Sequence, residues 1–331
     1  MSSDMKRRDL LKMAGGLAAG TVAGGLLGSK AIAATNSAST DGKAKKRVYR
    51  IAHITDVHVK PEARSPEGMV AALQHIRNQP DQPDVIFNGG DLIMDALAAT
   101  RERTKIQWDL AKKILADETK LPIENCIGNH DIWAWGGGKT DGTEADFLYG
   151  KEWALDELMM EKPYRSFDRA GWHFIVLDTV QTRPGGGGYS AHLDDEQFEW
   201  LKADLEKTPA TTPVFVFSHI PIINVGSYFF GKNTEKDGQW KVISVLMLLD
   251  ARRLKDLFYQ HKNVKLCVSG HIHLLDQIIY NDVNYICSGA VSGNWWGGPF
   301  QETPEGYGLI NLYDDGSHDY EYVIYGWKAK G

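Results

Sequence analysis

The sequence predicts an α/β fold in which two facing sheets are covered on their outer faces by helices. From residue 48, short strand-like runs alternate with amphipathic helical segments, and that alternation is typical of parallel strands joined by crossover helices. The second half of the chain repeats the alternation less regularly and ends in several strand-like runs. With 331 residues, 43% of them apolar, the chain can bury a substantial core.

The first half opens with a strand at residues 48–54, a helix at 67–78, a strand at 85–87, a helix at 100–116 and a strand at 123–127. A helix near 150–160 follows, and then a hairpin of residues 164–168 and 172–177 that turns at Arg169-Ala170-Gly171. Acidic residues Asp194, Asp195 and Glu196 open the next helix, to residue 206, because negative charge favours a helix N-terminus.

The second half continues with a strand at 214–217, a long loop, a helix at 241–261 and a strand at 264–268. Four further runs, at 276–280, 284–287, 307–313 and 320–325, have the length and the β-branched and aromatic content of strands. The turn Asp314-Asp315-Gly316 separates the last two. These strands complete the two sheets.

Residues 1–33 predict an export signal rather than part of the fold. A basic stretch is followed by a weakly apolar run rich in Gly and Ala, and Ala31-Ile32-Ala33 fits a cleavage site. The pair Arg7-Arg8, with two leucines and a lysine after it, resembles the twin-arginine (Tat) signal. The apolar run is too short and glycine-rich for a good membrane span, and the alternative is a solvated basic N-terminus. We expect a Tat-type signal peptide at 1–33, a flexible leader at 34–47 and one domain at 48–331.

Charge and cysteine usage restrict the class of protein. The net charge is −6, and a basic footprint for nucleic acid is absent. Cys126, Cys267 and Cys287 lie inside apolar strand-like runs, which predicts buried free thiols rather than disulfides. An exported protein without disulfides favours folding before export, so we expect the Tat machinery as a partner and a periplasmic or extracellular location.

Five polar clusters each follow a predicted strand. They are Asp56-Val57-His58, Gly90-Asp91, Gly128-Asn129-His130-Asp131, Ser218-His219 and Gly270-His271-Ile272-His273. Ligands of open α/β sheets bind outside the carboxyl ends of the strands, so these side chains are expected to meet. Imidazole, carboxylate and carboxamide together suit ions such as Zn²⁺, Mn²⁺ and Fe. The candidate ligands outnumber those of a single catalytic zinc, which predicts two divalent ions with Asp91 between them.

In this order, the clusters resemble the calcineurin-like metallophosphoesterase family. The resemblance covers nearly the whole mature chain and implies a four-layer αββα sandwich of the metallo-dependent phosphatase type with a dinuclear centre. The residues that it implies for one ion are Asp56, His58 and His273, and those for the other are Asn129, His219 and His271. Asp91 would bridge the two ions. His130 would stand outside the ligands as the catalytic general acid.

The resemblance implies an enzyme, a metal-dependent phosphatase or phosphodiesterase, that acts by direct attack of a metal-bridging hydroxide. Family members usually have an acidic residue three positions after the bridging one, where it orients the histidine. Here Met94 stands at that position and Asp95 follows. Either a local shift brings Asp95 to His130, or that contact is missing.

The substrate is expected to be a small-molecule phosphoester, and the sequence does not separate monoester from diester. Aromatic residues are abundant near the strand ends: Trp133, Trp135, Tyr228, Phe229, Phe230, Trp240, Trp295 and Trp296. These rings would stack on a nucleotide or cover a lipid-like group, or else pack the loops together. Two other functions remain open, a metal-free binding or scaffold protein on this fold and a metallohydrolase of another ester or amide bond.

Overall fold

The computed structural model describes residues 32–34, 44–183, 186–231, 235–236 and 238–329. Nearly all of the predicted signal peptide, and residues 35–43 of the predicted leader, lie outside the described residues. The fold is that of the unit Ala31–Gly331.

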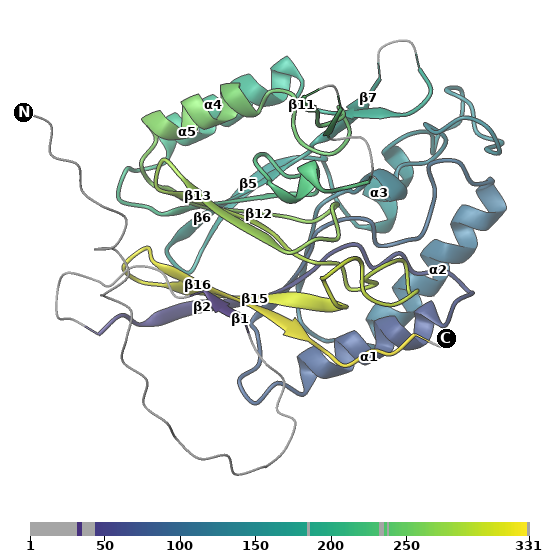
Figure 1. The fold of residues 1–331 in the computed structure, drawn as a ribbon, viewed down its shortest axis with the longest axis horizontal. Coiled ribbons are helices and arrows are strands. Elements are labelled where there is room, and N and C mark those ends of the chain that lie inside the picture. Colours follow the sequence, from purple (N-terminus) through teal and green to yellow (C-terminus); the bar gives the residue numbers. More distant parts are fainter. Residues whose placement is uncertain (1–31, 35–43, 184–185, 232–234, 237, 330–331) are drawn as a thin grey trace, which may run out of the picture. The chain divides into compact units, whose positions relative to one another are not determined.

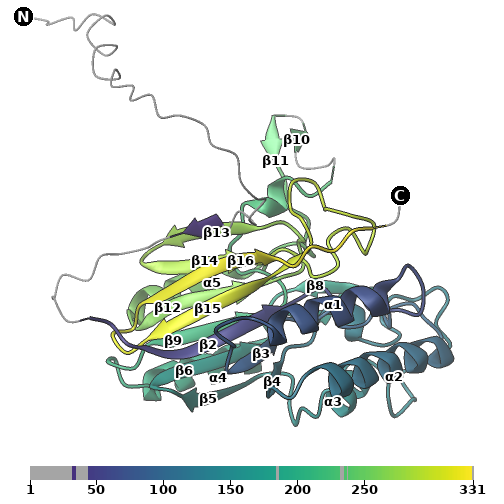
Figure 2. The same cartoon turned by 90° about the horizontal axis from the view of Figure 1, so that it is seen from below.

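The first of two large sheets has the strand order β1-β16-β15-β2-β3-β4, with β1 at Ile32–Ala34. Its parallel strands are β2 (Arg47–Ile54), β3 (Val85–Asn88) and β4 (Ile123–Asn125), joined through helices α1 (Ser65–Arg77) and α2 (Arg101–Glu118). β15 (Gly306–Tyr313) and β16 (His318–Ile324) run antiparallel beside them. Figure 2 shows α1 and α2 side by side.

The second sheet has the order β13-β14-β12-β9-β6-β5. The parallel strands are β6 (Trp172–Leu177), β9 (Val214–Ser218), β12 (Val264–Ser269) and β14 (Val283–Cys287), and the antiparallel edges are β5 (Arg165–Arg169) and β13 (Asp276–Tyr280). Helices α4 (Asp195–Lys207) and α5 (Ala251–Gln260) lie on its outer side, whereas α1 and α2 lie outside the first sheet (Figure 1). The predicted αββα sandwich is confirmed.

The core follows from the alternation of side chains along strands that are buried on both faces. Ile51 and Phe87 belong to the cluster between the sheets, while Ala52 and Ile86 belong to the cluster that includes the inner faces of the helices. The Phe87 ring lies 5.1–5.8 Å from the rings of three phenylalanines of the opposite sheet, Phe174, Phe215 and Phe217. Burial of each such ring contributes about 1.5–3 kcal/mol, so this cluster fixes the spacing of the two sheets.

Side-chain caps set the starts of two helices. Asp194 accepts a hydrogen bond from the Gln197 N–H (2.7 Å), as the acidic cluster there predicts, and Thr100 accepts one from the Arg103 N–H (3.3 Å). Each cap contributes about 1 kcal/mol.

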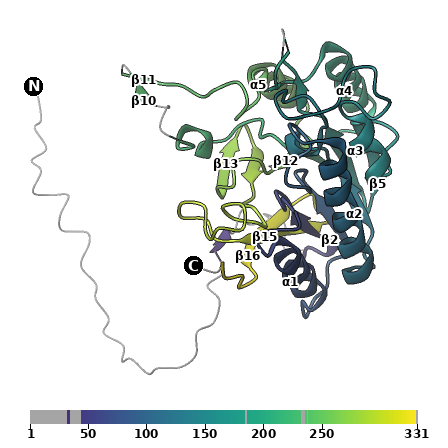
Figure 3. The same ribbon diagram turned by 90° about the vertical axis from the view of Figure 1, so that its right-hand side faces the viewer.

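The short elements are α3 (Glu152–Glu157), the 3₁₀ turns η2 (Asn129–Asp131) and η3 (Gly226–Tyr228), and the pairs β7 (Val180–Thr182) with β8 (Tyr189–Ala191) and β10 (Glu235–Lys236) with β11 (Gln239–Trp240). Figure 3 shows the β10–β11 hairpin standing out from the sheets.

The helix predicted at 241–261 is wrong in its first half, because α5 begins only at Ala251. Residues 241–250 give their backbone groups to tertiary contacts instead of an i to i−4 ladder. The Ser244 carbonyl accepts from the Ala191 N–H (2.8 Å), and the Leu248 N–H donates to the Pro221 carbonyl (3.1 Å). The β-branched residues Val242, Ile243 and Val245 weaken the competing helix.

Ile32–Ala34, which overlaps the end of the predicted signal peptide, forms strand β1 and pairs antiparallel with β16. All three cysteines are buried and free, as predicted. Within the described ranges, no helix has the length and apolar character needed to cross a membrane.

Candidate metal centre

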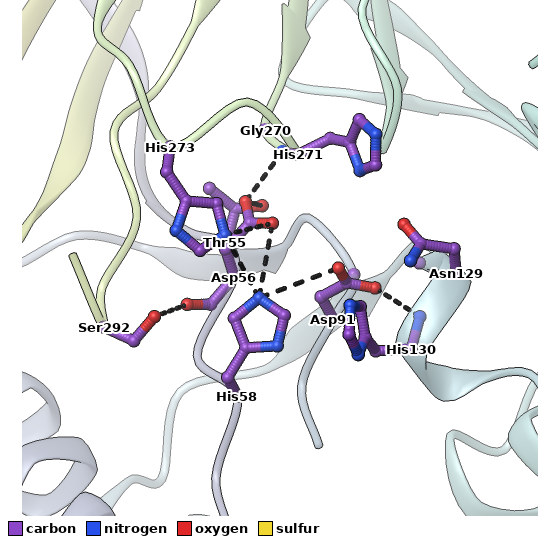
Figure 4. Close-up of polar contacts among 12 residues, drawn as sticks. Thr55, Asp56, His58, Asp91, Asn129, His130, Gly270, His271, His273 and Ser292 are labelled. Carbon is purple, nitrogen blue, oxygen red and sulfur yellow. Dashed lines mark hydrogen bonds and ion pairs between the residues drawn. The ribbon is translucent and has the colours of Figure 1, made fainter. Parts of the chain in front are cut away.

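The polar clusters predicted from the sequence converge at one edge of the sandwich. Asp56 and His58 follow β2, Asp91 follows β3, and Asn129 begins η2 just after β4. From the second sheet come His219, directly after β9, and the pair His271 and His273, after β12. Figure 4 shows the side chains of Asp56, His58, Asp91 and His273 pointing toward one another. Parallel strands from both sheets end here, which is why residues so far apart in sequence meet.

The first group consists of Asp56, His58 and His273, which are buried and offer ligand atoms close enough to hold one ion. The His273 Nε2 lies 3.1 Å from the His58 Nε2 and 3.4 Å from the Asp56 Oδ1. That Asp56 oxygen has no hydrogen-bond partner. The other, Oδ2, accepts hydrogen bonds from the Thr55 hydroxyl (2.6 Å) and the His271 N–H (2.8 Å). One oxygen of the carboxylate is therefore held by hydrogen bonds, and the other has no hydrogen-bond partner.

The second group gathers around His219. Its Nε2 lies 3.1 Å from the Asn129 Oδ1, 3.1 Å from the His271 Nδ1 and 3.3 Å from the Asp91 Oδ2. The opposite ring nitrogens face backbone carbonyls, with the His219 Nδ1 2.7 Å from the Gly89 oxygen and the His271 Nε2 2.8 Å from the Val245 oxygen. A nitrogen that donates to a carbonyl leaves the other ring nitrogen of a neutral imidazole as an acceptor.

With both imidazoles neutral, as metal binding requires, the second group brings four acceptor atoms together. Burial lowers the pKa of His219, but the adjacent Asp91 carboxylate outweighs it and raises that pKa to about 9. The cluster requires positive charge at this point, and a divalent cation would supply it. The first group also requires positive charge, because the Asp56 Oδ1 has no hydrogen-bond partner. Both groups therefore fit metal ions by the chemistry of their donors.

Asp91 connects the two groups. Its Oδ2 lies 3.7 Å from the His58 Nε2 and 3.3 Å from the His219 Nε2, so a single oxygen faces a histidine of each group. Its Oδ1 accepts a hydrogen bond from the His130 N–H (2.7 Å). Neutral imidazoles are needed for metal binding, and burial lowers the pKa of His58 and brings that of His271 to about 4. The geometry supports Asp91 as the bridge; the assignment of each residue to one ion stays a prediction.

The backbone at the ligands is strained. Five of the seven predicted ligands have left-handed φ angles: Asp56 (53°), His58 (48°), Asp91 (53°), His271 (73°) and His273 (60°). Such conformations cost non-glycine residues of order 1–3 kcal/mol each. The backbones also approach closely, because a Cβ on Gly128 would lie 2.2 Å from the Asp91 nitrogen, and one on Gly270 would lie 2.0 Å from the Thr55 Oγ1. The sharp turns point successive side chains into one site.

Asp131 holds the loop that carries Asp91, a role that the sequence motifs did not predict. Its buried carboxylate accepts hydrogen bonds from the N–H groups of Asp91 (2.8 Å), Leu92 (2.9 Å), Ile93 (3.3 Å) and Gly128 (2.9 Å). Burial and the neighbouring Asp91 carboxylate raise its pKa to about 7, against the effect of the N–H donors. Asp131 thus positions the loops of Asp91 and Asn129 relative to each other.

His130 lies beside the ligands. Its ring is perpendicular to that of His58, with 4.7 Å between the centroids, and its buried Nδ1 has no hydrogen-bond partner. Asp95 does not supply one, and its Oδ1 instead accepts a hydrogen bond from the Ala98 N–H (3.2 Å). Of the two alternatives for Asp95, the structure therefore supports the missing contact.

Comparison with known proteins agrees with this geometry. Residues 49–275 match the family model for calcineurin-like phosphoesterases. A curated relative from Arcobacter nitrofigilis, named as a probable glycerophosphodiester phosphodiesterase, is 22% identical over 240 residues, which cover 70% of this chain and 75% of that protein. The crystal structure of a dimetal phosphatase from Danio rerio covers 85% of this chain and 100% of its own, with a TM-score of 0.56 and 13% identity. At 13% identity, this similarity shows a shared fold only.

The family model spans well over half of the chain, from the start of β2 to the residues just after His273. This confirms the resemblance seen in the sequence motifs and the enzyme class that it implies. The chain belongs to the calcineurin-like phosphoesterase family and is a metal-dependent phosphoric ester hydrolase.

Proposed function

We propose that this protein is a phosphodiesterase with two divalent ions, Mn, Fe or Zn, held on either side of Asp91. The observation that carries the proposal is the placement of the Asp91 Oδ2 between histidines of the two groups. When bound, such a pair of ions activates water and neutralises the phosphoryl oxygens for in-line displacement. No covalent phosphoenzyme is needed.

The chain's own residues hold and orient the reacting groups. Asp91, Asp56 and the histidines fix where the phosphoryl group lies, and the strained turns behind them keep these side chains preorganised. His130 stands next to the site, with its ring against that of His58. We assign it the transfer of a proton to the leaving oxygen.

A diester is favoured over a monoester for two reasons. The curated relative is named for glycerophosphodiester cleavage, and a diester phosphate carries one negative charge where a monoester carries nearly two. In the part of the chain that the structure describes, no Lys or Arg forms a hydrogen bond or ion pair with the seven predicted ligands, so no fixed cation is in place for the extra charge.

The experiment compares a diester and a monoester with the same alcohol on the protein loaded with Mn²⁺, with metal content measured in the same samples. We expect a higher kcat/KM for the diester. Comparable or better turnover of the monoester would refute the diester assignment. Absence of hydrolysis of either ester at two ions per chain would refute the phosphoesterase mechanism itself.

We also propose that the protein is exported by the Tat pathway to the periplasm or beyond. The support is the Arg7-Arg8 pair, the apolar run and the small-residue cleavage site in order. Replacement of both arginines by lysine is expected to leave uncleaved precursor in the cytoplasm, as seen by fractionation. Lys45→Arg and Lys46→Arg, outside the signal, serve as the control. Unchanged export of the Arg7→Lys, Arg8→Lys protein would contradict the Tat assignment.

A further inference from the structure

The loop after β14, residues 288–300, is built onto the first metal group. The Ser292 hydroxyl donates to the Asp56 carbonyl (2.7 Å), and the Trp296 Nε1 donates to the His58 carbonyl (3.1 Å). The His273 Nδ1 donates to the carbonyl of Gly293. Because this loop is hydrogen-bonded to all three residues of the group, its side chains are held at fixed positions beside the site.

The loop carries Trp295 against the ligands. The Trp295 ring centroid lies 4.5 Å from that of His273, with the planes 35° apart, and 5.9 Å from that of His58. The backbone of Trp295 is left-handed, with a φ of 47°, which a bulky residue rarely adopts. Trp296 is almost wholly buried, whereas Trp295 remains partly exposed. The strained turn thus presents one indole to the site and buries the next.

Two phenylalanines extend this surface. The ring centroid of Phe300 lies 5.8 Å from that of Trp295 and 5.8 Å from that of His273. The centroid of Phe230 lies 5.6 Å from that of Phe300. Trp240, the exposed indole of the β10–β11 hairpin, instead lies with its ring centroid 5.9 Å from those of Tyr228 and Phe229. Trp133 is fully buried. Of the tryptophans noted in the sequence, Trp295 is thus the one whose ring lies against the imidazole rings of predicted ligands.

We propose that Trp295 is a specificity-determining residue that stacks on a planar, nucleobase-like substituent of the phosphodiester. The proposal rests on the proposed phosphodiesterase function. A flat ring next to the phosphate position, fixed by its own backbone and flanked by further rings, offers a π-face rather than hydrogen-bond donors. Such a surface binds planar heterocycles and does little for a small polyol such as glycerol.

The test uses two methyl phosphodiesters that differ only in the other alcohol, adenosine 5′-monophosphate methyl ester and glycerol 3-phosphate methyl ester. Hydrolysis is followed by phosphorus NMR, so that no chromogenic ring competes for Trp295. Stacking predicts that Trp295→Ala lowers kcat/KM for the adenosine ester about tenfold to a hundredfold, mainly through KM. The glycerol ester should be cleaved at nearly the original rate, and Trp295→Phe should retain most of the preference.

Trp240→Ala is the matched control, since it removes an exposed indole that does not contact the ligands. Metal content is measured for every variant. An equal loss with both esters, or a loss of bound metal in Trp295→Ala, would show that the ring only supports His273 and would overturn the proposal. An unchanged ratio between the esters would do the same. Failure of the wild-type protein to cleave either ester at full metal occupancy would instead overturn the phosphodiesterase function.

Discussion

His130 is the residue whose role separates chemistry from metal binding. It follows Asn129 directly, lies against the His58 ring, and is not among the seven predicted ligands. Its backbone N–H also orients Asp91, a contact that a side-chain substitution leaves in place. The side chain can therefore be removed without removing a predicted ligand.

We expect His130→Ala to keep both ions and to lose rate in proportion to the need of the leaving group for a proton. Removal of a general acid typically costs about 10²–10⁴-fold. An alkyl ester should suffer most, and a p-nitrophenyl ester least. The measurement is kcat for both esters at equal metal content, with His261→Ala, at the end of α5, as control. Equal losses with both esters would assign His130 to phosphate positioning instead.

The metal centre also shows which residue roles a sequence conveys. The positions of Asp56, Asp91 and His219 after apolar runs could be predicted, because strand ends are marked by the change from apolar to polar residues. The role of Asp131 could not, since it depends on a turn that aims the N–H groups of Asp91 and Leu92 at its carboxylate. Which aromatic ring contacts the ligands could not be predicted either, because loop conformation decides it.

At the scale of elements, helix α1 supports the metal centre through one glycine. A Cβ on Gly68 would lie 2.0 Å from the Trp296 ring, and Trp296 holds the His58 carbonyl. The ring also packs on Trp327, with 5.5 Å between centroids. A helix, two loops and a metal ligand are thus packed through one indole.

Gly68→Ala is therefore expected to destabilise the protein by about 1–2 kcal/mol, because overpacking outweighs the helix-forming advantage of alanine. Metal affinity should weaken as well. Thermal unfolding and metal titration measure the two effects. In the Trp296→Phe background the cost of Gly68→Ala should shrink, which a double-mutant cycle detects. The same cost in both backgrounds would exclude a clash with Trp296.

The elements themselves were predictable to different degrees. The parallel strands β2, β3, β9 and β12 carry apolar runs long enough to be unambiguous, and their predicted bounds agree within a residue or two. The region before α5 was not predictable, because its apolar residues fit a helix as well as a packed loop. Contacts with Ala191 and Pro221 decide between them, and such contacts are absent from any local pattern.

At the scale of the whole molecule, His173 links β5, β6 and α4 at the start of β6, whereas the metal ligands follow strand ends. Its Nδ1 lies 2.7 Å from the Asp168 Oδ1, and its Nε2 lies 2.9 Å from the Asp204 Oδ2. The hydrogen bond to Asp204 and then that to Asp168 raise the pKa of His173, against the effect of burial. The charged form of this histidine therefore stabilises the fold.

A raised pKa in the folded state means that the stabilisation is fully present below the unfolded pKa of about 6.5 and is lost as pH rises through the folded value. We expect His173→Gln to lower the free energy of unfolding by about 1–2 kcal/mol at acidic pH and by less at alkaline pH. Unfolding of wild type and variant across this range measures the difference. A difference that does not change with pH would contradict a charged His173.

The two sheets meet at Asp91, and the proposed centre of two ions depends on this residue as the bridge. The most direct measurement is electron paramagnetic resonance of the protein loaded with Mn²⁺, together with metal analysis. A centre bridged by Asp91 should hold two ions per chain with magnetic coupling, and Asp91→Asn should stay folded but lose most of its metal and the coupling. Asp95→Asn, which alters a carboxylate outside the metal groups, should retain both. One ion per chain, or two uncoupled ions in the wild-type protein, would contradict a centre bridged by Asp91.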